Sequence, residues 1–226
     1  MQTKQQQQEV SHMNSALTTS LSPFKKAQVS AEKQVSKNKT LKGSAPMKII
    51  TAQTYVSRRT HALTPEQAEV RRIAYALKVP TSEACELAAR ELAPLLDAAE
   101  AITTTIVLMP VPNSTGSTDA NRQFANELAA ETHRRYPERR VQVKITVGRK
   151  HPVESSCVRR KRGLPGLQGE EHAFIRVAGP MTATETAYYF VDNMATTGAT
   201  LAACRDALRF GEGIVWADEG RTINHD

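Results

Sequence analysis

The sequence has little of what marks several classes of protein. Its 226 residues include only three cysteines, widely spaced and without a CxxC pair, which argues against a disulfide scaffold or a thiolate zinc site. No apolar run approaches the roughly 20 residues of a membrane span, and the N-terminus lacks the apolar stretch of a secretory signal. Aromatic residues make up only 5% of the chain, so we expect a core of Ala, Val, Ile and Leu. These absences predict a soluble cytoplasmic protein with no membrane partner.

Positive charge is concentrated near the N-terminus. The formal net charge is +7, but residues 1–46 hold seven lysines against two acidic residues, so the rest of the chain is nearly balanced. This stretch contains four consecutive glutamines and no convincing apolar period. Such a segment buries too little surface to offset its ordering entropy. We therefore expect a disordered tail over 1–46 and a folded domain over 47–226.

Helix and strand patterns alternate along the rest of the chain. Helices are expected over 64–77, 81–101, 119–136 and 198–210, with Pro94 as a kink or break in the second. Strands are expected over 47–56, 102–112, 141–147, 173–179, 187–192 and 213–218. The polar and basic segment 148–172 is predicted to be a long loop. The alternation favours an α/β fold with a mainly parallel central sheet flanked by helices, whose ligands bind at the carboxyl ends of the strands.

The segment YYFVDNMATTGAT, residues 188–200, leads from one of these strands into a helix. Its apolar residues run into Asp192, and small or hydroxylated residues follow. The N–H groups and partial positive charge of a helix N-terminus attract anions, and Gly198 lets a phosphate approach the backbone. Asp192 can accept hydrogen bonds from sugar hydroxyls or bind Mg²⁺, directly or through water. The pattern favours a sugar phosphate, although a helix simply capped by Thr196, after a solvated Asp192, would read the same way.

The same segment resembles the phosphoribosyl pyrophosphate motif of type I phosphoribosyltransferases. That motif has four apolar residues, two acidic residues, two variable residues and then Thr-Thr/Gly-Gly-x-Thr before a helix. The resemblance implies that Asp192 and Asn193 bind the ribose, with Mg²⁺ as a cofactor near Asp192. It also implies a 5′-phosphate site made of Ala195, Thr196, Thr197, Gly198, Ala199 and Thr200. Asn193 stands where the family usually has a second acid, which removes one negative charge.

A second strand end carries a similar likeness. The segment VLMPVPNSTGS, residues 107–117, resembles the pyrophosphate loop of the same family, and its Pro-Val-Pro is similar to that of the members related to competence protein ComF. The implied loop residues are Val111, Pro112, Asn113, Ser114 and Thr115. The resemblance extends over about 103–218, which leaves 47–102 as a possible helical hood.

A basic segment over 149–162 follows the strand predicted at 141–147. It contains Arg149, Lys150 and four consecutive cations at 159–162. One interpretation is a mobile lid that closes over pyrophosphate, with Arg149 and Lys150 as catalytic candidates. The other interpretations are a solvated loop and a patch that binds nucleic acid.

The resemblance implies a Mg²⁺-dependent phosphoribosyltransferase, a glycosyltransferase of nucleotide metabolism. Such an enzyme transfers the phosphoribosyl group of phosphoribosyl pyrophosphate to a nitrogenous base or a related nucleophile. One alternative is a noncatalytic, ComF-like module that binds a nucleotide or phosphoribosyl pyrophosphate and takes part in DNA handling. Another is an unrelated α/β domain. The acceptor base stays open, as does the oligomeric state, a homodimer included.

Overall fold

The computed structural model describes residues 47–56, 62–79, 81–100, 105–178 and 186–219. The tail predicted over 1–46 lies outside the described residues, and so do parts of the predicted hood. No helix within the described ranges is long and apolar enough to cross a membrane.

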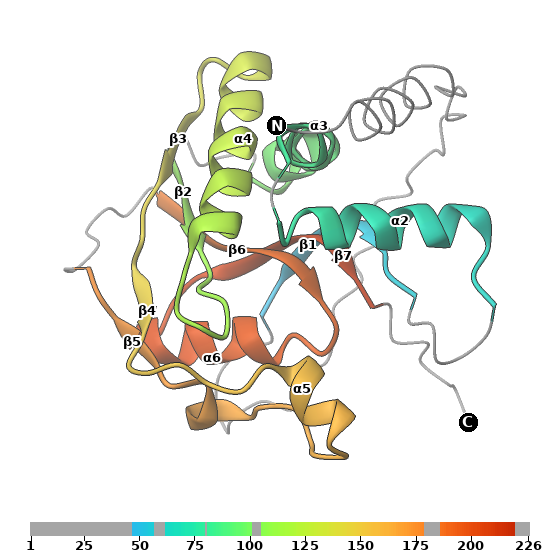
Figure 1. Ribbon diagram of the computed structural model, residues 1–226. Coiled ribbons are helices and arrows are strands. Elements are labelled where there is room, and N and C mark those ends of the chain that lie inside the picture. The colour runs from blue at the N-terminus through green and yellow to red at the C-terminus, as the bar shows by residue number, and fades with distance from the viewer. Residues whose placement is uncertain (1–46, 57–61, 80, 101–104, 179–185, 220–226) are drawn as a thin grey trace, which may run out of the picture. The chain divides into compact units, whose positions relative to one another are not determined.

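Five strands form one parallel sheet in the order β1–β7–β6–β2–β3 (Figure 1). Their bounds are Ile49–Thr54 for β1, Thr105–Pro110 for β2, Arg140–Val143 for β3, Thr186–Ala195 for β6 and Glu212–Asp218 for β7. Strands β2 and β7 are buried along almost their whole length, as expected of parallel strands that are covered on both faces. The predicted α/β fold with a parallel central sheet flanked by helices is confirmed.

Helices pack on both faces of this sheet (Figure 1). Their bounds are Pro65–Ala76 for α2, Ser82–Ala99 for α3, Asp119–Arg135 for α4 and Ala199–Leu208 for α6. Helices α2, α3 and α4 share one core, which includes Leu92 and Phe124. Helix α6 packs on the opposite face, where Leu201 and Cys204 are buried. The two cores fix the sheet between them, and with it the position of its carboxyl edge.

The helix starts follow from local sequence. The Thr64 hydroxyl accepts from the Gln67 N–H, the Gln67 side chain accepts from the Thr64 N–H, and Pro65 occupies the first turn of α2. A kink or a break was expected at Pro94, and the structure contains no break, since helix α3 continues through this residue. Its neighbour Leu92 is fully buried, so packing of the apolar face offsets the hydrogen bond that proline cannot donate.

The region after β3 differs most from the prediction. Instead of one strand over 141–147, β3 ends at Val143 and a separate strand β4, Val147–Arg149, pairs antiparallel with β5, Phe174–Arg176. The predicted long loop contains helix α5, Ser156–Lys161, and a 3-10 helix η1, Gly169–His172. Local caps explain both, since the Ser155 hydroxyl accepts from the N–H of Val158 and Gln168 forms a capping box with Glu171.

Candidate functional site

The ends of β2 and β6 lie side by side at the carboxyl edge of the sheet. Pro110 pairs with Val191 in register, and the N–H of Val111 donates to the Val191 carbonyl at 3.0 Å. From α4, the amide Nδ2 of Asn121 donates both to the Val111 carbonyl at 2.8 Å and to Oδ1 of Asp192 at 3.2 Å. The structure therefore brings together the two strand ends that the sequence singled out, and one side chain joins them.

The turn between β6 and α6 has a conformation suited to an anion. Strand β6 runs on to Ala195, three residues beyond the predicted strand end at Asp192. Gly198 then takes a φ of +69°, a left-handed conformation that favours glycine, directly before the first residue of α6. The hydroxyl of Thr197, and not that of Thr196, accepts from the Ala199 N–H at 3.3 Å. A small-residue turn thus delivers the N-terminus of a ten-residue helix to the sheet edge.

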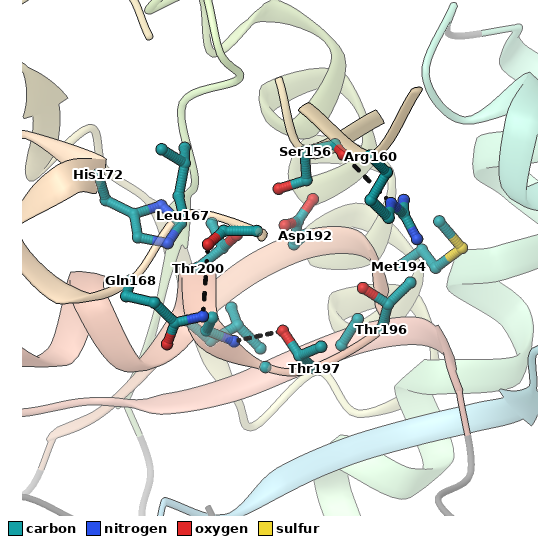
Figure 2. Close-up of a pocket in the computed structure, with 15 residues that line it drawn as sticks. Ser156, Arg160, Leu167, Gln168, His172, Asp192, Met194, Thr196, Thr197 and Thr200 are labelled. Atoms are coloured by element: carbon teal, nitrogen blue, oxygen red, sulfur yellow. Dashed lines mark hydrogen bonds between the residues drawn. The ribbon is translucent and has the colours of Figure 1, made fainter. Parts of the chain in front are cut away.

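A cavity of about 170 Å³ opens at this turn (Figure 2). The predicted residues that line it are Asp192, Ala195, Thr196, Thr197, Gly198, Ala199 and Thr200. A second wall comes from the chain segment that contains α5 and η1; its lining residues are Ser156, Arg160, Gly166, Leu167, Gln168 and His172. Seven of the predicted phosphate and ribose residues therefore line one partly open cavity.

Asp192 is the carboxyl group of this cavity. It is partly buried, and its Oδ1 accepts from the N–H of Asn193 at 2.8 Å as well as from Asn121. Burial raises the pKa of Asp192 from 3.8 to about 6, while these two hydrogen bonds and the charges of Lys78 and Arg149 act in the opposite direction. The group is ionised at neutral pH but poorly solvated, so a hydroxyl donor or a cation would stabilise its charge.

Asn193 does not line the cavity. Neighbouring strand residues point to opposite faces of a sheet, and the buried Asn193 side chain donates from Nδ2 to the carbonyl of Ala74 in α2 at 3.4 Å. Its backbone N–H is the part that reaches the site, through Asp192.

Replacing Asn193 by aspartate is expected to destabilise the fold by about 1–3 kcal/mol, because a buried carboxylate would face the Ala74 carbonyl without a donor. Urea unfolding at neutral pH measures this loss. The uncharged Asn193→Leu, of similar volume, is the control and should cost less. An unchanged unfolding midpoint together with tighter binding of a sugar phosphate would contradict the placement, since it would mean that the side chain faces the cavity.

Arg149 holds two loops together. Its Nε donates to the Asn113 carbonyl at 2.6 Å, its Nη1 donates to the His172 carbonyl, and its guanidinium lies 4.2 Å from the centre of the Phe174 ring. Burial lowers its pKa, but a guanidinium keeps its proton at any physiological pH. Its neighbour Lys150 has an exposed side chain. Arg149, one of the two predicted catalytic cations, therefore connects the loop after β2 to η1.

Arg149→Met is expected to lower the free energy of unfolding by about 2 kcal/mol, since it removes charged donors from two backbone carbonyls. The matched control is Lys150→Met, which removes the same charge from an exposed position and should change stability by less than about 0.5 kcal/mol. Both are measured by denaturant unfolding. Equal effects of the two substitutions would show that the Arg149 contacts do not stabilise the fold.

Hydrogen bonds hold the loop that is predicted to bind pyrophosphate, and most of them form between its own residues. Asn113 Oδ1 accepts from the N–H of Thr115 at 2.9 Å, from its hydroxyl at 2.7 Å, and from the N–H of Ser117 at 3.1 Å. The Ser114 carbonyl accepts from the Val153 N–H at 2.9 Å. Val111, Pro112, Asn113, Ser114 and Thr115 do not line the cavity at α6; they extend the sheet edge on the β2 side of Asp192.

Several side chains of the basic run 159–162, in α5 and at its C-terminal end, form hydrogen bonds and ion pairs within the segment. Arg159 donates to the Pro165 carbonyl at 2.8 Å and pairs with Glu171 at 3.3 Å, and Arg162 pairs with Glu154 at 2.8 Å. Arg160 reaches the cavity, with its Nε donating to the Ser156 carbonyl at 3.1 Å (Figure 2). The segment thus covers the cavity with at least one cation on its inner side.

The described residues contain no group of three His, Cys, Asp or Glu side chains that could hold a metal ion. Asp192 is the carboxylate of the cavity. Mg²⁺ usually keeps several waters and is held by one or two carboxylates plus substrate phosphates. The site therefore fits a Mg²⁺ ion that arrives with a polyphosphate ligand and contacts Asp192.

The sequence patterns did not single out two residues of the site, Asn121 and His172. Asn121 occupies a buried position on the apolar side of α4, and a polar residue at such a helical position is a signal that periodicity can reveal. His172 lies in a segment predicted to be a loop, where no hydrophobic period exists to indicate its burial.

A comparison with known protein families finds no family that matches this sequence, and a comparison with curated proteins finds no match.

Proposed function

We propose that this protein is a type I phosphoribosyltransferase-like enzyme, nearest in layout to the ComF-related members. One observation supports this most directly: seven of the eight residues of the predicted ribose and phosphate motif, all but Asn193, line one cavity at the carboxyl edge of a parallel sheet. Ligands of open α/β sheets bind at this edge. The loop after β2, joined to Asp192 through Asn121, supplies a second set of backbone groups beside it.

In the proposed reaction, the 5′-phosphate of phosphoribosyl pyrophosphate lies against the N–H groups of Gly198 and Thr200, and the Ala199 N–H exchanges the Thr197 hydroxyl for a phosphate oxygen. Asp192 accepts hydrogen bonds from the ribose hydroxyls, which orients C1 toward the incoming base. The bond between C1 and pyrophosphate breaks, and a nitrogen of the base forms the new bond at an oxocarbenium-like centre. Bound Mg²⁺ would neutralise charge on the departing pyrophosphate. The protein contributes orientation and electrostatic stabilisation.

A noncatalytic module that binds phosphoribosyl pyrophosphate or a nucleotide is the second candidate. It is favoured by the placement of Asn193, whose side chain contacts α2, and of Arg149, whose guanidinium contacts backbone carbonyls. These contacts occupy donor groups of both side chains within the protein, and they leave the turn before α6 and Asp192 unaffected.

Incubation with phosphoribosyl pyrophosphate, Mg²⁺ and a panel of bases distinguishes the two candidates. Release of pyrophosphate that depends on one base supports the enzyme. Calorimetric binding of ribose 5-phosphate without release under any base supports the binding module. Absence of both release and binding, with the fold intact by circular dichroism, would contradict both candidates and leave an unrelated α/β domain.

A further inference from the structure

His172 is a buried histidine whose ring has no hydrogen-bond partner. It is 2% exposed, and neither Nδ1 nor Nε2 has a partner among the described residues. The Leu167 backbone lies close enough to influence its pKa but does not meet hydrogen-bond geometry. The ring stacks on Phe174, with centroids 5.4 Å apart and 16° between the planes. Buried polar side chains are nearly always hydrogen-bonded, so this one calls for an explanation.

The surroundings of His172 point to a ligand. The residue lines the cavity at the N-terminus of α6, and Figure 2 shows its ring directed from η1 toward Thr200 in the first turn of α6. Burial and the neighbouring charge of Arg149 lower the pKa of His172, while the Leu167 backbone and then the charge of Glu171 act in the opposite direction. The imidazole is therefore neutral at physiological pH, with one N–H donor and one acceptor nitrogen.

We propose that His172 is a ligand-binding residue, which donates a hydrogen bond across the cavity to the phosphate group held at the N-terminus of α6. This inference rests on the proposed function, because it takes a phosphate ester as the ligand. The phosphate would then contact backbone N–H groups of the turn on one side and the His172 ring on the other. Arg160, on the same wall as His172, adds a positive charge.

The position of His172 is set by contacts outside the cavity. Its carbonyl accepts from Arg149, and its ring is held by Phe174. A donor held in this way before the ligand arrives loses little conformational freedom on binding, which favours affinity. The second wall therefore selects for a group that can accept a hydrogen bond, such as a phosphate oxygen, over an apolar group of the same size.

Calorimetric titration with ribose 5-phosphate tests this contact. His172→Phe keeps an aromatic ring against Phe174 but removes both nitrogens, so we expect about tenfold weaker binding with an equal or higher melting temperature. His172→Gln, which retains a donor, should bind more tightly than His172→Phe. The control is His133→Gln, an exposed histidine on α4, which should bind like the wild type.

The histidine ring signals in NMR provide a readout that packing alone would not change. Saturation with ribose 5-phosphate is expected to raise the pKa of His172, because the phosphate charge stabilises the imidazolium. The ring signals of His133 should not respond to the ligand. Wild-type binding with unaltered affinity in His172→Phe and an unmoved His172 pKa would overturn this inference and leave the proposed function intact. Absence of wild-type binding to ribose 5-phosphate and to inorganic phosphate would overturn both.

Discussion

Gly198→Ala is expected to weaken ribose 5-phosphate binding by roughly 10- to 100-fold, a loss of one to two hydrogen bonds to a charged group. The added Cβ would project at the turn where a phosphate must approach the backbone. The φ of +69° at this position also strains any residue with a side chain, by about 1–2 kcal/mol. Calorimetry and denaturant unfolding measure the two effects separately.

Gly163→Ala is the matched control for this substitution. Gly163 has a φ of +72°, close to that of Gly198, and a Cβ there would meet no atom within 4 Å. It does not line the cavity. Both substitutions should therefore lose similar stability, and only Gly198→Ala should lose affinity. Equal affinities in the two variants would show that the turn does not hold the phosphate.

Asp192→Asn is expected to reduce base-dependent pyrophosphate release by about 100-fold or more, if two charge-assisted hydrogen bonds to the ribose are lost. The substitution keeps an oxygen that can accept from Asn121 and from the N–H of Asn193, so the fold should persist. In the wild type, affinity for phosphoribosyl pyrophosphate should fall as the pH drops below about 6, where Asp192 becomes protonated. The Asn variant should keep only the pH dependence that comes from protonation of the ligand's own phosphate groups, whose second pKa is about 6.

The raised pKa of Asp192 also predicts how the stability of the fold changes with pH. The folded-state pKa of Asp192 lies above the ordinary value of 3.8, so the folded protein binds this proton more tightly than the unfolded chain does. The Asp192 contribution to stability is therefore greatest at acidic pH and is lost as the pH rises from about 4 to 6. Asp192→Asn should gain stability relative to the wild type across that interval, measured by urea unfolding at each pH.

Glu212→Gln is the control for the binding and activity measurements on Asp192→Asn. Burial also raises the pKa of Glu212, but this residue begins β7 and so lies at the opposite edge of the parallel sheet. Its replacement should leave ligand affinity and its pH dependence unchanged. A loss of activity equal to that of Asp192→Asn would mean that the carboxyl at the end of β6 has no special part in binding.

Much of the architecture could be predicted because short sequence patterns determine where its strands and helices begin and end. Buried parallel strands such as β2 are apolar runs that end at proline, and α2 begins with a capping box that three neighbouring residues specify. The sequence predicts that this strand ends at Asp192, because the polar Asn193 and the flexible Met194 interrupt the apolar run. Pairing with β7 nevertheless continues as far as Ala195, since neighbouring strands decide where a ladder ends.

The second wall of the cavity could not be predicted in this way. Strands β4 and β5 have three residues each, too few to show a period, and their pairing joins positions 25 or more residues apart. The burial of His172 and the contacts of Arg149 depend on that pairing. Motif likeness therefore located the turn at α6, whereas the residues that face it across the cavity required the three-dimensional structure.

The amide of Asn121 is expected to couple ligand binding at the two halves of the proposed site. One nitrogen donates to the Val111 carbonyl, at the start of the loop after β2, and to the Asp192 carboxylate. A ligand that draws Asp192 toward it changes the strength of both hydrogen bonds, and so does a ligand that moves the loop. Such coupling is reciprocal: the factor by which a sugar phosphate changes the affinity for pyrophosphate equals the factor by which pyrophosphate changes the affinity for the sugar phosphate. Asn121→Leu would bring that factor toward one.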